Sequence, residues 1–229
     1  MINSHGTITT ANLAQKRADT TRYGPLRIDL SRHVVQVLDQ LNLIYALDGG
    51  NLVGAYRDGK MLPHDDDFDF VLYTDALSHK VDDQEKDEFL CSLRASIEPL
   101  LDVHTSVRVV TTYAKKLEIY RPQYGKYRFC SGQHHPVPFD TDYHNVTCDL
   151  TLLLPRTEEP GILQYQHTGS AKHRHNLDDL LPLSSVDYEG HSYNAPASIE
   201  GYLTSSYGYL GTDAVYNPET GFYEQANTL

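Results

Sequence analysis

Residues 48–73, DGGNLVGAYRDGKMLPHDDDFDFVLY, contain the pattern that decides the fold. Two adjacent glycines, Gly49 and Gly50, allow a tight turn because glycine adopts backbone angles that other residues resist. Pro63 interrupts the chain again, four aspartates follow within five positions, and residues 68–73 have the composition of a strand. The stretch therefore predicts a turn that opens a short helix, and then a strand with carboxylates at its start.

Two of the four aspartates are spaced to share one ligand. Successive side chains of a strand point to opposite faces, so Asp67 and Asp69 should lie on one face while Phe68 and Phe70 point into the core. Ligand sets made only of oxygen suit Mg²⁺ or Mn²⁺. We therefore interpret Asp67 and Asp69 as metal ligands, in preference to a solvated acidic turn, and we expect Asp66 to face elsewhere.

The glycine turn that precedes the aspartates predicts an anion site. A glycine turn that opens a helix presents backbone N–H groups, which bind phosphate at other helix N-termini. Protein-bound Mg²⁺ is typically held by one or two carboxylates together with substrate phosphates. The turn and the aspartates together indicate metal-assisted chemistry on a nucleotide donor.

A third carboxylate is expected from a neighbouring strand, and Asp149 is the best candidate. It stands within the apolar run at residues 146–154, where an unpaired charge would be costly. A buried aspartate needs a partner, and a metal ion would be one. We favour a role as metal ligand or as general base over a hydrogen-bonded aspartate at a strand end.

The rest of the chain predicts an α+β or α/β domain in which helices flank a central sheet. Strands are expected at residues 43–47, 68–73, 107–112, 117–120, 127–130 and 146–154. Helices are expected from Ser31, at residues 84–101 and at residues 199–207. Three segments follow: a polar, irregular N-terminal arm at residues 1–24, a core at 25–160, and a C-terminal extension of the same globular unit at 161–229. Residues 164–176 are interpreted as a loop or linker.

Composition excludes several classes of protein. The formal net charge is −12, which argues against a nucleic-acid binder because such proteins need a basic surface. Three widely spaced cysteines form no disulfide framework, which favours a reducing compartment. The sequence has no apolar run of about 18 residues and no signal-peptide pattern. We therefore expect a cytoplasmic protein without a membrane span.

The quoted stretch resembles the LicD family, which includes fukutin and the fukutin-related protein. Members carry Gly-Thr-Leu-Leu-Gly-x-x-Arg followed by Pro-Trp-Asp-x-Asp-x-Asp. The present chain has Gly50-Asn-Leu-Val-Gly-Ala-Tyr-Arg57, and then Pro63-His-Asp-Asp-Asp-Phe-Asp69. The family's C-terminal motifs follow in order, at residues 180–183, 188–190, 195–196, 200–203 and 207–208. The resemblance covers residues 30–208 or thereabouts.

The resemblance implies a nucleotidyltransferase fold and a phosphotransfer reaction. LicD-like enzymes move a phospho-alcohol, such as phosphocholine or ribitol phosphate, from a CDP-activated donor to a sugar hydroxyl. Asp65, Asp67 and Asp69 would then be the family's acidic triplet, with Asp67 and Asp69 as the main metal ligands. The resemblance also implies that Gly49, Gly50 and Asn51 bind the donor phosphates. Arg57 would support the loop that these residues form, or bind a phosphate. Asp149 would complete the metal site or act as the general base.

The chain departs from the family pattern beside the predicted donor site. His64 replaces the usual Trp, Asn51 replaces Thr or Ser, and Asp48 stands where many relatives have an aromatic residue or His. Two alternatives therefore stay open: a nucleotidyltransferase that moves NMP from an NTP to a small molecule, protein or RNA, and a catalytically silent binding protein with this fold.

Other polar residues give weaker signals. Three histidines, His134, His135 and His144, could form a zinc site with Cys130 and Cys148, but the spacing matches no familiar zinc pattern. We interpret these histidines as surface or hydrogen-bonded side chains. Lys115 and Lys116 precede a predicted strand, and nothing in the sequence favours a place in the cleft over exposure.

Overall fold

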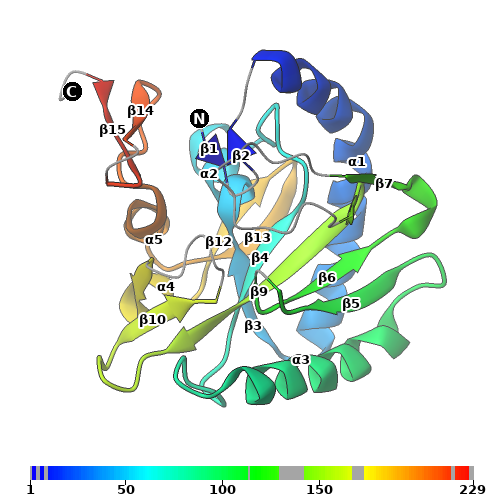
Figure 1. Ribbon diagram of the computed structural model, residues 1–229, viewed down its shortest axis with the longest axis vertical. Coiled ribbons are helices and arrows are strands. Elements are labelled where there is room, and N and C mark those ends of the chain that lie inside the picture. The colour runs from blue at the N-terminus through cyan, green and yellow to red at the C-terminus, as the bar shows by residue number, and fades with distance from the viewer. Residues whose placement is uncertain are drawn as a thin grey trace.

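The central element of the fold is β9 (Thr147–Pro155), which lies in the middle of a seven-stranded mixed sheet (Figure 1). The computed structural model describes residues 2–3, 6–7, 10–112, 114–128, 142–166, 173–217 and 220–226. All residues of β9 before Pro155 are buried, which explains why the strand is apolar along both faces. One edge of β9 pairs with β4, and the opposite edge pairs first with β6 and then with β10.

The pairing between β4 and β9 is parallel, and the other pairings among the described strands of this sheet are antiparallel. Because β9 has two successive partners on one edge, the sheet divides and curls. The strands that join β9 are β3 (Ile44–Leu47), β4 (Asp69–Tyr73), β5 (Ser106–Val110), β6 (Lys116–Tyr120), β10 (Ile162–Tyr165) and β11 (Arg174–Asn176).

Helices flank this sheet (Figure 1). α1 packs against β9, α3 against β5 and β6, and α2 against β4. α5 packs against β11 and α2. The helices are α1 (Thr10–Gln40), α2 (Gly49–Asp58), α3 (Asp83–Ile97), α4 (Leu177–Leu180) and α5 (Ile199–Tyr207), with the 3-10 turns η1 (Glu98–Leu100) and η2 (Pro122–Tyr124).

Two-stranded hairpins complete the described chain. They are β1 (Ile2–Asn3) with β2 (Gly6–Thr7), β7 (Lys126–Arg128) with β8 (Asp142–His144), β12 (Ser184–Tyr188) with β13 (His191–Ala195), and β14 (Ala214–Asn217) with β15 (Phe222–Gln225). The β12–β13 hairpin contacts α2 and β3. The Tyr-rich C-terminal extension thus packs on the sheet, as the sequence predicts.

An aromatic cluster joins this hairpin to the strand that carries the aspartates. The ring centroid of Phe68 lies 5.8 Å from that of Tyr188 and 5.5 Å from that of Tyr193. Phe70 lies 6.2 Å from Tyr193 and 5.6 Å from Tyr45. Offset and edge-on aromatic pairs of this kind stabilise a core beyond the area that they bury. The predicted inward orientation of Phe68 and Phe70 is confirmed, since both are fully buried.

The prediction of a curled mixed sheet with flanking helices is confirmed. The predicted helix at residues 84–101 forms as α3 followed by η1, and the helix predicted at residues 199–207 forms as α5. The strand predicted at residues 127–130 forms as β7, although residues 129–130 lie outside the described residues. The expected division of the chain at residue 160 stays a prediction.

Two predictions about irregular segments are wrong. α1 begins at Thr10 instead of Ser31 and continues through Pro25, because tertiary contacts stabilise its polar first half. Lys16 and Thr20 on this half bind the aspartate segment. Residues 164–176 are also not a simple loop, because β10 extends to Tyr165 and β11 pairs with it. β11 is polar and only three residues long, so the sequence gives little indication of it.

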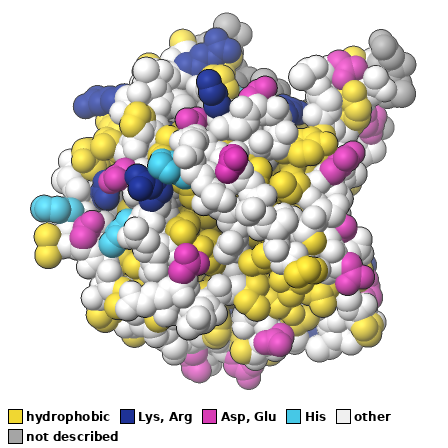
Figure 2. Space-filling model, turned by 180° about the vertical axis from the view of Figure 1, so that it is seen from behind, with side chains coloured by type: hydrophobic (Ala, Val, Ile, Leu, Met, Phe, Trp, Pro, Cys, Tyr) yellow, Lys and Arg dark blue, Asp and Glu magenta, His cyan; other side chains and the backbone are white. Residues whose placement is uncertain are grey.

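The surface agrees with the acidic composition. On the face that Figure 2 shows, Lys and Arg side chains form small groups among acidic and apolar ones and make no continuous basic surface. Cys91 is exposed and Cys148 is buried, both as free thiols. Within the described part of the chain, no helix has both the length and the apolar character needed to cross a bilayer.

The close contact between α2 and the segment that follows it gives a first prediction. A Cβ at Gly54 would overlap the carbonyl oxygen of Lys60 and would also meet Tyr188. Gly54→Ala should therefore lower the free energy of unfolding by about 1–3 kcal/mol, as overpacked sites do. Gly24→Ala is the matched control, because its Cβ would meet only the Met61 sulfur at 3.4 Å and alanine favours a helix. Urea unfolding of both variants measures the difference, and equal midpoints would contradict this packing account.

Candidate metal centre

Three carboxylates from two neighbouring strands meet at one end of the sheet. Asp67 lies just before β4, Asp69 begins β4, and Asp149 lies in β9 directly beside Asp69 in the parallel register. One oxygen from each of the three lies within 4.8 Å of the others. Asp67 and Asp149 are buried, and Asp69 is half-buried. The structure therefore brings together the three side chains that the sequence singles out.

Burial raises the pKa values of two of these carboxylates, Asp69 and Asp149. Burial raises the pKa of Asp69 well above its ordinary value, and the charges of Asp67, Asp149 and Asp65 raise it further. Burial also raises the pKa of Asp149 to about 6, with the cation of Lys116 acting in the opposite direction. Like charges in a buried site favour either protons or a bound cation.

One oxygen of this cluster has no donor. Asp149 Oδ1 is buried and makes no hydrogen bond with any described residue. Buried carboxylate oxygens nearly always accept a hydrogen bond, so an exception needs an explanation. A divalent cation between Asp149, Asp67 and Asp69 would supply the missing partner, and an all-oxygen set suits Mg²⁺ or Mn²⁺. The residues present therefore fit such an ion.

The N-terminus of α2 lies against these carboxylates. Gly49 has a φ of +59°, and a Cβ there would overlap Asp69 Oδ2. A Cβ on Gly50 would lie 2.9 Å from Asp65 Oδ1. Glycine is required at this point by backbone conformation and by the approach of the carboxylates. The two glycines are adjacent to the centre as expected, and phosphate binding by them stays a prediction.

Asn51 connects the helix to the aspartate segment. Its Nδ2 donates to Asp65 Oδ2 at 2.9 Å and to the Tyr188 hydroxyl at 3.2 Å. Its Oδ1 accepts from the backbone N–H of Asp69 at 2.6 Å. This buried amide is fully engaged within the protein, so its evident role is to position Asp65 and Asp69. Direct phosphate binding by Asn51 is not visible in this arrangement.

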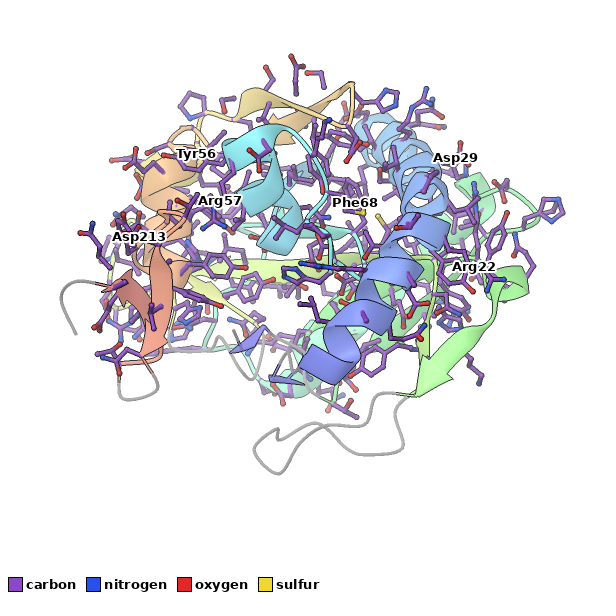
Figure 3. All side chains as sticks on the ribbon, turned by 90° about the horizontal axis from the view of Figure 1, so that it is seen from above. Arg22, Asp29, Tyr56, Arg57, Phe68 and Asp213 are labelled. Atoms are coloured by element: carbon purple, nitrogen blue, oxygen red, sulfur yellow. The ribbon has the colours of Figure 1, made fainter. Side chains whose placement is uncertain are left out.

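Arg57, the last predicted phosphate residue, binds the C-terminal segment. Its guanidinium donates to the carbonyl oxygens of Leu210 and Gly211, at 2.8 and 3.4 Å from Nη2. Figure 3 shows Arg57 and Asp213 on the same side of the molecule, whereas Phe68 lies between α2 and α1. The structure thus places Arg57 against the C-terminal segment, and both roles that the resemblance implies, support of the donor loop and phosphate binding, stay predictions.

The remaining aspartates of the segment are held by α1. Arg27 is almost fully buried and donates from Nη1 to the carbonyl oxygen of Asp65 at 2.9 Å. The Thr20 hydroxyl donates to the same oxygen at 2.8 Å. Asp66 accepts from Lys16 Nζ at 2.7 Å, but one of its oxygens also lies within 4.8 Å of one oxygen each of Asp65 and Asp67, so the prediction that Asp66 faces elsewhere is not confirmed. Burial, together with the charges of Asp67 and Asp66, raises the pKa of Asp65 well above its ordinary value.

The sequence did not predict a group of polar side chains next to the centre, formed by Asp48, Tyr165, Tyr202 and Tyr207. Asp48 immediately precedes α2 and is buried, which raises its pKa, while the backbone of Gly49 and the hydroxyl groups of Tyr165 and Tyr202 act in the opposite direction. Burial raises the pKa of Tyr207, and the carboxylates of Asp48 and Asp69 raise it further. These tyrosines come from β10 and α5, far along the chain, so no local signal predicts their meeting.

Sequence reasoning also left Lys116 and Glu118 unassigned. Lys116 is buried and forms an ion pair with Asp149 Oδ2. Glu118 faces Asp149 across the β6–β9 pairing and binds Arg108 Nε and His144 Nδ1, the latter at 3.1 Å. The alternation of the strand Lys-Leu-Glu-Ile-Tyr would have placed both charges on one face. His144 is thus hydrogen-bonded, as predicted, while Cys130, His134 and His135 lie outside the described residues.

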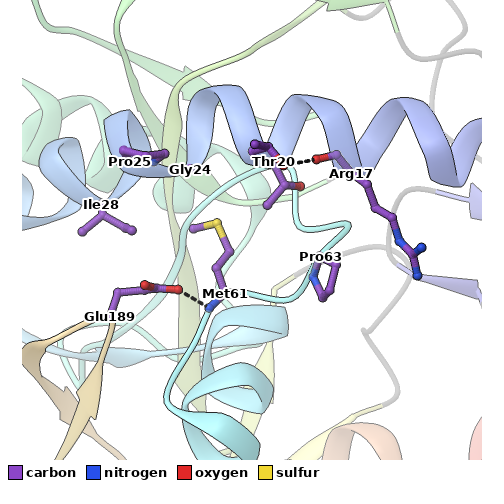
Figure 4. A pocket seen from close by; sticks show the side chains of 9 residues that line it. Arg17, Thr20, Gly24, Pro25, Ile28, Met61, Pro63 and Glu189 are labelled. Atoms are coloured by element: carbon purple, nitrogen blue, oxygen red, sulfur yellow. Dashed lines mark hydrogen bonds between the residues drawn. The ribbon is translucent and has the colours of Figure 1, made fainter.

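A separate groove of about 520 Å³ lies between α1 and the segment after α2 (Figure 4). None of the three converging carboxylates lines it. Glu189 closes one end of the groove, where its Oε1 accepts from the backbone N–H of Met61 at 2.6 Å. Its lining residues are Arg17, Thr20, Thr21, Gly24, Pro25, Ile28, Met61, Pro63 and Glu189.

Comparison with known families identifies the chain. The model of the LicD/FKTN/FKRP nucleotidyltransferase domain matches residues 42–198, which include all the converging aspartates. The chain belongs to the LicD family. This family is of phosphotransferase type and is generally metal-dependent. No curated protein matches the chain. Membership confirms the resemblance that the sequence motifs carry.

The role of Asn51 in this LicD-family centre is testable. Asn51→Ala removes three buried hydrogen bonds and leaves the partners on Asp65 and Asp69 without a donor or acceptor. We expect the free energy of unfolding to fall by about 2–3 kcal/mol. Tyr188→Phe is the control, since it removes only the 3.2 Å bond and should cost about 1 kcal/mol or less. Denaturant unfolding compares the two, and equal losses would contradict a bracing role for the amide.

Proposed function

We propose that this chain is a metal-dependent transferase that moves a phospho-alcohol or sugar-phosphate group. The donor would be a nucleotide-activated compound of the CDP-alcohol type, and the acceptor would be a hydroxyl of a carbohydrate or related molecule. The observation that carries the proposal is the convergence of Asp67, Asp69 and Asp149 in a chain of the LicD family, together with an oxygen of Asp149 that no described residue hydrogen-bonds.

Asp67, Asp69 and Asp149 would hold Mg²⁺ or Mn²⁺. The bound cation would neutralise negative charge on the donor phosphates and favour in-line displacement. The parallel register of β4 and β9 fixes Asp69 beside Asp149, and the buried Phe68 anchors the chain between Asp67 and Asp69 in the core. Rigid strands position ligands more reliably than loops do.

The N-terminus of α2 is the proposed seat of the donor phosphates. Its first backbone N–H groups, at Gly49 and Gly50, have no partners within the helix, and the helix dipole favours an anion there. Asn51 would contribute by holding Asp65 and the start of β4, through the bonds described above. Arg57 would contribute by fixing the C-terminal segment near α2.

Asp149 is assigned here as a ligand in preference to a general base. Its Oδ2 is already paired with Lys116, and its Oδ1 is the oxygen without a donor. A carboxylate that is paired to a lysine and bound to a cation is less basic, which makes it a poor acceptor for the proton of the acceptor hydroxyl.

Asparagine substitutions test this assignment. Asp67→Asn, Asp69→Asn and Asp149→Asn should each lower turnover by about 10³-fold or more, because the cation loses a charged ligand. Asp178→Asn is the matched control, since Asp178 is exposed on α4. Transfer is measured with Mn²⁺, a panel of CDP-alcohols and carbohydrate acceptors, and circular dichroism checks the fold of each variant.

Two outcomes would overturn the proposal. Full transfer activity in the Asp67→Asn or Asp69→Asn variant would exclude the metal assignment. Label transfer from radiolabelled NTPs with release of pyrophosphate, and none from CDP-alcohols, would favour the nucleotidyltransferase alternative.

A further inference from the structure

A buried lysine, Lys116, lies inside the acidic centre. Lys116 begins β6, is almost fully buried, and forms an ion pair with Asp149 Oδ2. Burying an ammonium group is costly unless it is paired. The ion pair with Asp149 offsets this cost, and Asp149 is one of the proposed metal ligands.

The two oxygens of Asp149 have opposite environments. Oδ2 is occupied by Lys116, whereas Oδ1 is buried without a hydrogen bond from any described residue. The lysine thus fixes the orientation of the carboxylate and leaves a single oxygen for another partner. One oxygen of Asp149 lies within 4.8 Å of one oxygen each of Asp67 and Asp69.

A neighbouring network keeps Lys116 directed to Asp149. Glu118 is the other carboxylate on this face of β6, and both of its oxygens are engaged. Oε2 pairs with Arg108, and Oε1 lies 3.1 Å from His144 Nδ1 and 3.4 Å from the Thr147 hydroxyl. Because Glu118 already has these partners, Asp149 is the carboxylate left for the lysine.

We propose that Lys116 is a resident counter-ion of the metal centre, a positioning residue that rests on the function proposed above. It keeps the carboxylates assembled while the cation is absent. It also lowers the intrinsic affinity of the centre for a divalent cation, because a positive charge a few ångströms away repels the incoming ion. Tight cation binding then requires the donor phosphates, whose negative charge offsets that of the lysine. Cation and donor would therefore bind cooperatively.

The test compares Lys116→Met with the charge-conserving Lys116→Arg. Mn²⁺ binding is measured by electron paramagnetic resonance without nucleotide and then with CDP. We expect Lys116→Met to bind Mn²⁺ at least about tenfold more tightly than the wild type in the absence of CDP, and CDP to tighten binding less than it does in the wild type. Lys116→Arg should resemble the wild type in both respects.

Thermal unfolding gives a second readout. The metal-free Lys116→Met protein should melt at a lower temperature than the wild type, and Mn²⁺ should raise its melting temperature by more. Should Lys116→Met not fold without metal, refolding in Mn²⁺ is expected to restore it, and failure in Mn²⁺ as well would contradict the proposal.

The outcomes separate the two proposals. Unchanged or weaker Mn²⁺ binding in Lys116→Met would show that the lysine is merely structural and would overturn the counter-ion role. Absence of Mn²⁺ binding in the wild type, with and without CDP, would overturn the proposed metal centre itself and this inference with it.

Discussion

The structure depends on carboxylates that converge in a buried place. The parallel register of β4 and β9 sets Asp69 beside Asp149, and the chain before β4 adds Asp67. Like charges at such distances in a poorly solvated site repel strongly. The surrounding residues reduce this cost: Lys116 pairs with one carboxylate, and the amide of Asn51 donates to Asp65 in the same segment. A bound divalent cation would neutralise the remaining repulsion between the carboxylates.

Apolar packing supplies the rigidity that this arrangement requires. Phe68 alternates with Asp67 and Asp69 along the chain, and its ring packs on Tyr188 and Tyr193 of the β12–β13 hairpin. The C-terminal extension therefore packs against the segment that carries the aspartates and stabilises it. α1 acts from another side, through hydrogen bonds from Thr20 and Arg27 to the Asp65 backbone. The site is thus supported by segments from both ends of the chain.

The sequence predicts those features of this centre that follow from local periodicity along the chain. Alternation along a strand is a period-two signal, so the shared face of Asp67 and Asp69 and the burial of Phe68 could be read directly. Asp149 could be predicted as a site residue because a charge within an apolar run needs a partner. The pairing of Lys116 with Asp149 depends on strand register between distant segments, and the same holds for the tyrosines around Asp48. The polar first half of α1 forms because of tertiary contacts, which local propensity does not contain.

Anomalous diffraction from crystals soaked in Mn²⁺ tests the central claim most directly, because it locates the ion independently of any substrate. One peak is predicted between the carboxylates of Asp67, Asp69 and Asp149, with Asp149 Oδ1 as its ligand and Oδ2 still paired with Lys116. A peak at another site, or none when bound CDP is visible at α2, would contradict the account.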